Sequence, residues 1–154
     1  MGLRGKTALV TGATGGIGEA FARAFAAEGC NIVFNGLGDP GDIEKLRSEI
    51  GRSGNEVIYH PADVGKPGEV EAMIAVAMQR FGAIDILINN AVTRHYAPVE
   101  AFPPDKWERA LAVNLSAAFH TIRLALPAMR ARNWGRIINM GRSEERRVGK
   151  ECRL

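Results

Sequence analysis

The sequence predicts a single α/β domain built on a doubly wound, mainly parallel β-sheet. Short apolar runs rich in β-branched residues alternate with segments of helical periodicity, and a glycine-rich turn joins the first run to the first helical segment. The 154 residues, 46% of them hydrophobic, are enough for one hydrophobic core and too few for two. This combination is typical of nucleotide-binding α/β folds.

The apolar runs predict the strands of the sheet. They lie at residues 7–10, 31–34, 56–59, 84–88 and 136–140. Because connections between parallel strands are right-handed, the expected strand order is 3-2-1-4-5. The order then reverses between the first and fourth strands, and ligands of such sheets bind at the carboxyl ends of the strands at that point.

Four helical segments are expected between these strands: one between the first two strands, one at about residues 41–51, one between the third and fourth strands, and the longest at about residues 105–130. Apolar side chains repeat at helical spacing in each, so each should place one face against the core. The predicted core residues are Ile17, Phe21, Ala24 and Phe25 in the first segment, Ile43, Leu46 and Ile50 in the second, Val70, Met73, Ile74, Ala77 and Phe81 in the third, and Trp107, Leu111, Leu115, Ile122 and Leu126 in the fourth.

Composition argues against several classes of protein. No apolar run is long enough to span a bilayer, so we expect a cytoplasmic protein without membrane contact. Cys30 and Cys152 lack the spacing of a metal site or a disulfide framework, so no metal is expected. Of the net charge of +3, residues 142–154 supply +2, from five basic and three acidic residues, and no nucleic-acid-binding motif accompanies it. We therefore expect no nucleic-acid partner.

The glycine-rich turn predicts a phosphate site. It lies between a strand and a helix, where glycine lets the backbone approach a pyrophosphate and the helix N-terminus offers free N–H groups. The alternative, a glycine-rich connection without a ligand, is disfavoured because strand, turn and helix follow in the required order. The turn residues predicted to bind the cofactor are Thr11, Gly12, Thr14, Gly16, Ile17 and Gly18.

With this turn, T-G-x-x-x-G-I-G, the chain resembles the short-chain dehydrogenase/reductase family over about residues 1–140. Further motifs follow in the family's order: Asp63-Val64 after the third strand, Asn89-Asn90-Ala91 after the fourth, and Asn114 in the last helix. The resemblance implies a Rossmann fold, with Asp63 and Val64 near the adenine, and Asn90 and Ala91 supporting the sheet centre and cofactor. It also implies that Asn114 belongs to a catalytic tetrad with serine, tyrosine and lysine.

Cofactor choice depends on the end of the second strand. An acidic residue there would accept from the ribose of NAD, and a cation would hold the extra phosphate of NADP. Asn35 and Gly36 occupy these positions, and no cation follows before Lys45. Because an unpaired phosphate is costly to desolvate, this favours NAD over NADP. For Asp39 the sequence favours a role as a turn residue or helix cap over a role as the acceptor for the ribose hydroxyl.

The resemblance also implies that this chain is inactive by itself. The family's Tyr-x-x-x-Lys follows the fifth strand, whereas here both Tyr59 and Tyr96 precede it and neither has a lysine four residues later. Ser143 follows a departure from the family pattern and is not taken as the catalytic serine. Residues 142–154 instead resemble a translated sequencing adapter, one reading frame of which encodes the chain from Arg142 to Cys152. We expect a truncated dinucleotide-binding domain at 1–141 and an artefactual, disordered tail at 142–154, the alternative being a natural basic tail.

Within the family, Asn35-Gly36-Leu37-Gly38-Asp39 and Asn114-Leu115-Ser116-Ala117 most resemble bacterial 3-hydroxybutyrate dehydrogenases. This implies a small-molecule hydroxy-acid substrate and a full-length parent that forms a homo-oligomer. Arg94 is either a residue that binds the substrate carboxylate or a solvated loop arginine. Two other functions remain open: a fragment of a 3-oxoacyl-thioester reductase, and a non-catalytic dinucleotide-binding or sensor module.

Overall fold

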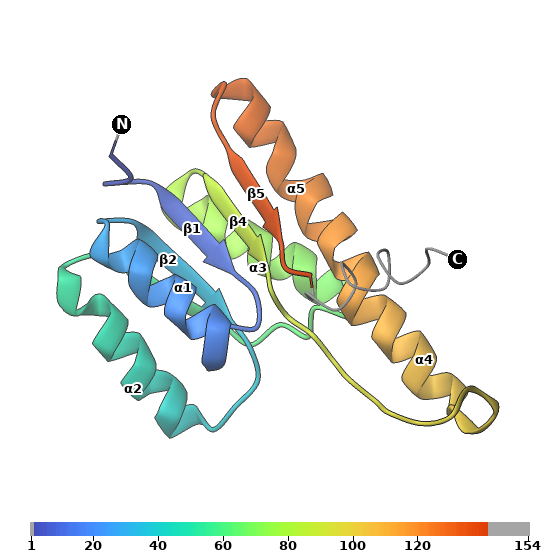
Figure 1. The fold of residues 1–154 in the computed structure, drawn as a ribbon. Coiled ribbons are helices and arrows are strands. Elements are labelled where there is room, and N and C mark those ends of the chain that lie inside the picture. Colours follow the sequence, from blue (N-terminus) through green and yellow to red (C-terminus); the bar gives the residue numbers. More distant parts are fainter. Residues whose placement is uncertain (1, 142–154) are drawn as a thin grey trace, which may run out of the picture.

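The computed structural model describes residues 2–141, so the predicted tail at 142–154 lies outside the described residues. The chain forms a five-stranded sheet in the order β3-β2-β1-β4-β5, with every neighbouring pair parallel (Figure 1). This confirms the predicted fold class and strand order. The order reverses between β1 and β4, as expected, so the carboxyl ends of these two strands are the place to look for a ligand.

The structure places each element close to its predicted range. The strands are β1 (Thr7–Val10), β2 (Asn31–Asn35), β3 (Val57–His60), β4 (Ile86–Asn89) and β5 (Arg136–Asn139). The helices are α1 (Gly16–Ala27), α2 (Pro40–Ile50), α3 (Pro67–Phe81), α4 (Pro104–Leu111) and α5 (Ala117–Ala131), with 3₁₀ turns at Gly51–Ser53 and Val99–Ala101. A π-helical segment, Ala112–Ser116, joins α4 to α5.

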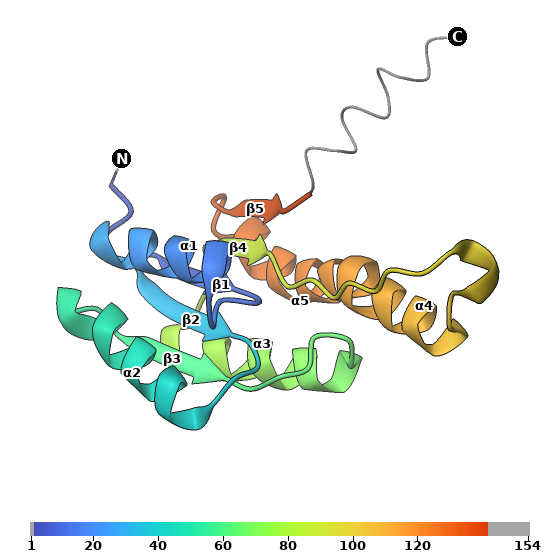
Figure 2. The ribbon, with the colours of Figure 1, turned by 60° about the horizontal axis from the view of Figure 1, so that its bottom comes forward.

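Two layers of helices cover the sheet, and Figure 2 shows α1 and α2 on one side and α3 and α5 on the other. Because successive strand residues point to opposite faces, Ala8 and Val10 of β1 join the α1–α2 core while Leu9 joins the α3–α5 core. The central strands β2, β1 and β4 are therefore buried on both faces, which explains why they consist of continuous rather than alternating apolar residues. The edge strands are less covered, since β3 is partly buried and β5 is mostly exposed. No helix of residues 2–141 has the length and apolarity that crossing a membrane requires.

The predicted core face of α2 is confirmed, and that of α3 is confirmed except for Phe81, which is only partly buried. The predicted core face of α1 is wrong in part. Ile17 is 63% exposed and Ala24 is exposed as well, and the buried positions of α1 are Gly18, Ala22 and Ala26. Small side chains let α1 lie close to β1 and β2, so the larger Phe21 and Phe25 pack only at the border of the core. Periodicity of large residues therefore misplaced the buried face.

The last helical segment differs most from its prediction. Trp107 and Leu115 are 55% and 66% exposed, while Leu111, Ile122 and Leu126 are only partly buried. The buried side chains instead follow a separate four-residue spacing: Val113, Ala117, Thr121, Ala125 and Met129. This spacing runs through the π-helical segment, whose extra residue per turn was not foreseen. A stripe of mostly small residues thus faces α3 and β4, and the large residues Trp107, Leu115 and Phe119 face outward.

Candidate functional site

The β1–α1 turn packs so tightly against the end of β4 that two of its positions require glycine. Gly12 has a φ of +63°, and a Cβ there would lie 2.7 Å from the Cα of Ala91. A Cβ at Gly18 would overlap the carbonyl oxygen of Gly12. These contacts assign Gly12 and Gly18 to the packing of the turn, which is a requirement separate from any ligand.

The N-terminus of α1 has the features of an anion site. Gly15 caps the helix without a side-chain hydrogen bond, and the first turn therefore has no side-chain partner for its N–H groups. Gly16 is exposed and has a φ of +58°, and no atom from outside its own helix and its chain neighbours lies within 4 Å of where its Cβ would be. Ile17 is exposed beside it. Open space over free N–H groups at a helix N-terminus suits a phosphate.

Thr11 and Asn90 join the carboxyl ends of β1 and β4. The Thr11 hydroxyl accepts from the backbone N–H groups of Asn90 and Ala91 at 3.0 and 3.1 Å. The Asn90 amide Nδ2 donates to the carbonyl oxygens of Thr11 and Gly12 at 3.1 and 3.0 Å. Both side chains therefore bond to backbone, and their role in the site is to hold the turn in place.

Beside this turn lies a cavity of about 230 Å³ at the carboxyl ends of the strands. Its walls contain six of the predicted cofactor residues: Gly12, Asn35, Gly36, Asp63, Val64 and Ala91. Leu37, Val92, Thr93, Arg109 and Val113 complete the walls with Ala62. A larger cavity of about 760 Å³ lies between α2 and β3 and shares Leu37 with this one. We assign the site to the smaller cavity, because it lies where the strand order reverses.

Asn35 lines the cavity, but its side chain points into the fold. The amide Nδ2 donates to the carbonyl oxygens of His60 and Ala62, at 2.9 and 2.8 Å, and the residue is 1% exposed. Thr14 donates its hydroxyl to the Leu37 carbonyl at 2.8 Å and so ties the β1–α1 turn to the segment after β2. The ribose end of a dinucleotide would therefore meet Gly36 and Leu37 rather than the Asn35 amide.

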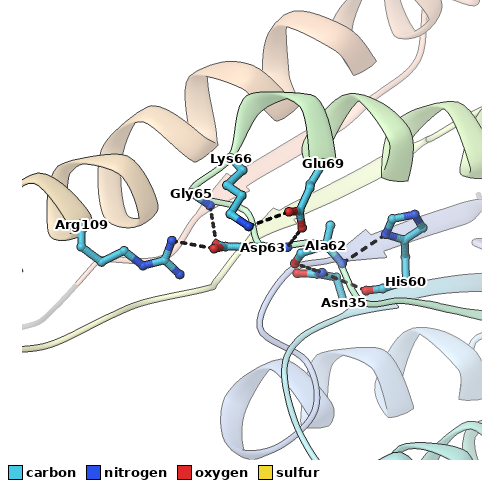
Figure 3. Close-up of polar contacts among 8 residues, drawn as sticks. All are labelled: Asn35, His60, Ala62, Asp63, Gly65, Lys66, Glu69 and Arg109. Carbon is cyan, nitrogen blue, oxygen red and sulfur yellow. Dashed lines mark hydrogen bonds and ion pairs between the residues drawn. The ribbon is translucent and has the colours of Figure 1, made fainter.

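Asp63 is the centre of a polar cluster on the opposite wall (Figure 3). One of its carboxylate oxygens accepts from Arg109 Nη1 at 2.8 Å, and the other accepts from the backbone N–H of Gly65 at 3.0 Å. These bonds, that of Arg109 first, hold the pKa of Asp63 below its usual range against the opposing effect of burial. Glu69 accepts from the Asp63 N–H at 2.7 Å and pairs with Lys66 at 2.9 Å.

Arg109 and Val113 were missed from the sequence because no motif marks them. The only sequence signal is that Arg109 and Val113 are four residues apart, which places the two on one side of the same helix. The structure brings both to the cavity wall.

His60, next to this cluster, predicts a pH dependence of stability. Its Nδ1 accepts from the Ala62 N–H at 3.2 Å, and burial lowers the pKa of His60 despite the opposing charge of Glu69. The folded-state pKa is below the unfolded value of about 6.5, so this contribution is complete above pH 6.5 and is lost as the pH falls through that value toward the folded pKa. The melting temperature should therefore fall by a few degrees between pH 8 and pH 5.5.

The matched variant for this prediction is His60→Asn, whose side-chain oxygen can accept from Ala62 but does not titrate. Melting curves of the parent chain and the variant across this pH range measure the effect. The variant should lose less of its stability than the parent. Equal losses in the two proteins would contradict the assignment to His60.

Asn114 lies in the π-helical segment and forms two bonds with one residue. Its Oδ1 accepts from the Thr93 N–H at 2.9 Å, and its Nδ2 donates to the Thr93 carbonyl at 3.0 Å. The predicted tetrad residue thus fixes the segment after β4, and π-helical turns are frequent at functional sites. Arg94, on the same segment, is exposed and is not part of the cavity wall, so its predicted contact with substrate stays a prediction. Among residues 2–141 no cluster of His, Cys, Asp or Glu could hold a metal ion.

Comparisons with known proteins agree with this geometry. The family model described as short chain dehydrogenase matches residues 6–149. A D-beta-hydroxybutyrate dehydrogenase of Cupriavidus necator is 51% identical over 140 residues, which are 90% of this chain and 53% of that protein. The chain thus spans about half the length of that curated relative.

Two solved structures are similar across most of the chain. L-sorbose reductase from Gluconobacter frateurii, complexed with NADPH and L-sorbose, gives a TM-score of 0.84 at 33% identity, covering 89% of this chain and 52% of the other. NAD+-bound xylitol dehydrogenase gives a TM-score of 0.80 at 34% identity, covering 88% of this chain and 52% of the other. Similar proteins thus bind either form of the nicotinamide dinucleotide.

Proposed function

The chain belongs to the short-chain dehydrogenase family, and we propose that it forms the dinucleotide-binding part of an NAD-dependent oxidoreductase. The reaction proposed for the whole protein is the interconversion of a secondary alcohol and a ketone, with 3-hydroxybutyrate or a similar short hydroxy acid as substrate. The similarity to the D-beta-hydroxybutyrate dehydrogenase supports this substrate class. We further propose a cytoplasmic enzyme.

The observation that carries the proposal is the combination of the open α1 N-terminus with the cavity beside it. The free N–H groups around Gly16 fit the pyrophosphate, and the wall formed by Asp63 and Val64 fits the adenine end. Ala91 and Thr93, on the β4 side, lie toward Asn114. A bound nicotinamide would supply the hydride acceptor, and the protein would orient it.

The preference for NAD rests on the segment after β2. Gly36 and Leu37 line the cavity there and carry no charge. Arg109 is the only cationic side chain among the described residues of this cavity wall, and it pairs with Asp63. Arg47, on the wall of the neighbouring larger cavity, pairs with Glu44 at 2.6 Å. The extra phosphate of NADP would therefore meet Leu37 with no unpaired cation from either described wall, which favours NAD.

Exposed apolar side chains support a homo-oligomeric parent protein. Trp107, Leu115 and Phe119 are 55%, 66% and 62% exposed along α4, the π-helical segment and α5. A stripe of this kind is typical of a surface that another subunit covers. We propose that this face, with the rest of the parent protein, takes part in self-association.

Calorimetric titration of the 154-residue chain with NAD+ and NADP+ tests the proposal. We expect NAD+ to bind and NADP+ to bind at least roughly tenfold more weakly, because a desolvated phosphate without a partner loses more than 1.4 kcal/mol. Incubation with NAD+ and 3-hydroxybutyrate should give no NADH, because proton transfer by the family's Tyr-x-x-x-Lys is absent from this sequence. A folded chain that binds neither dinucleotide would contradict the proposed function.

A further inference from the structure

We propose that Arg109 is a positioning residue that fixes the Asp63 carboxylate at the cavity wall and thereby sets selectivity for the adenine ring of the cofactor. The inference rests on the proposed function, since it concerns how a bound dinucleotide is recognised. Arg109 lies on α4, which is distant in sequence from the loop after β3 that contains Asp63.

Bonds from three places converge on Asp63 (Figure 3). Arg109 reaches it from α4, across 46 residues of sequence, and bonds one carboxylate oxygen at 2.8 Å. Gly65 bonds the other oxygen from the loop itself, at 3.0 Å. Glu69, in the first turns of α3, holds the Asp63 backbone N–H at 2.7 Å. The side chain and the backbone of Asp63 are therefore both fixed, and the carboxylate has a single defined orientation.

Gly65 leaves the space that the Arg109 guanidinium occupies. A Cβ at this position would overlap Arg109 Nη1 and would lie 3.1 Å from Val113 Cγ2. Its φ is outside the left-handed region, so the backbone itself would accept alanine. The absence of a side chain at Gly65 is therefore what lets the guanidinium reach Asp63.

The chemistry of the carboxylate explains why its orientation matters. Each carboxylate oxygen has two lone pairs, and each uses one in the bonds described, so each retains one for a donor. The exocyclic amino group of adenine is such a donor, whereas hypoxanthine has a carbonyl oxygen at that position. Arg109 also keeps the pKa of Asp63 low, so the acceptor stays ionised at neutral pH. A fixed, ionised carboxylate at this wall should favour the amino base over the carbonyl base.

The test measures binding of NAD+ and of nicotinamide hypoxanthine dinucleotide to the 154-residue chain and three variants. Arg109→Met should lower NAD+ affinity roughly tenfold while lowering affinity for the hypoxanthine analogue by less than about threefold, since only the former uses the fixed carboxylate. Gly65→Ala, which displaces the guanidinium without removing it, should change selectivity in the same direction. Arg109→Lys should restore part of it.

Arg123→Met is the matched control. Arg123, on α5, likewise pairs with a carboxylate, that of Glu71 on α3 at 2.9 Å, but neither residue lines the cavity. This variant should keep the parent's affinity for both dinucleotides, with folding checked by circular dichroism. Equal losses for both dinucleotides in Arg109→Met, or unchanged selectivity in Gly65→Ala, would overturn the inference alone. A parent chain that binds neither dinucleotide would overturn the proposed function and the inference with it.

Discussion

Replacing Gly16 by valine is expected to abolish NAD+ binding, a loss of roughly a hundredfold or more, while the chain stays folded. The valine side chain would occupy the open space over the N-terminus of α1, where we propose that the pyrophosphate lies. Apart from the two chain neighbours and the backbone of α1 itself, no protein atom lies within 4 Å of that Cβ position, so the Cβ meets no other part of the fold. The backbone at φ +58° does disfavour valine, at about 1–2 kcal/mol.

Gly82→Val separates the loss of the ligand from this backbone strain. Gly82 ends α3 with a φ of +70° and likewise has nothing within 4 Å of its Cβ position, but it lies among residues at the amino ends of the strands. Thermal melts should show similar destabilisation in the two variants, and calorimetric titration should show loss of NAD+ binding only for Gly16→Val. NAD+ affinity that is equal in Gly16→Val and the parent would exclude this turn as the phosphate site.

The sheet could be predicted from the sequence because its information is local. The three central strands, β2, β1 and β4, are buried on both faces, as Leu9 and Val10 show by packing into opposite cores. This makes each of them a short apolar run that can be recognised without knowledge of its neighbours, and the less buried edge strands β3 and β5 still contain such runs. Chain connectivity and handedness then leave few possible strand orders. The position of the reversal between β1 and β4 followed from these rules alone.

The helix faces were less predictable because small residues pack where large ones were expected. Ala22 and Ala26 of α1, and Ala117 and Ala125 of α5, are buried because the helices approach their neighbours closely. Hydrophobic periodicity weights large side chains, so on α5 it selected Ile122 and Leu126, which are only partly buried, instead of the small residues at the core. The short distance between these helices and the elements they pack against therefore decided which residues are buried.

The site was predictable only where a motif is local. The turn residues and Asp63 come to one end of the sheet as expected, but the sequence did not indicate that the Asn35 amide bonds inward to His60 and Ala62. Nor could it reveal the pair between Asp63 and Arg109, since residues of two distant segments meet only after the helices pack. Local sequence patterns predict which backbone segments form such a site. The side-chain contacts between distant segments become known only from the structure.

Replacing Asn90 by aspartate is expected to destabilise the fold by about 3–5 kcal/mol at pH 7. The Asn90 amide donates to the carbonyl oxygens of Thr11 and Gly12, and a carboxylate there would remove both donors and face two acceptors. The group cannot easily move away, because a Cβ at Gly18 would lie only 2.6 Å from its Nδ2, which shows how closely the turn surrounds it. Urea denaturation at pH 7 measures the loss.

The pH dependence of this variant provides the sharper test. Two facing carbonyl oxygens should raise the folded-state pKa of the new carboxyl group above its unfolded value of about 3.9. Protonation restores one O–H donor, so the deficit relative to the parent should shrink as the pH falls through the folded-state pKa. Asn31→Asp is the control, since Asn31 uses only its amide oxygen, which accepts from the Glu56 N–H at 3.2 Å, and a carboxylate keeps that bond. The control should stay within about 0.5 kcal/mol of the parent at pH 7. If Asn90→Asp were as stable as this control, or if its deficit were the same at pH 7 and pH 5, the Asn90 amide would not be what fastens the turn to β4.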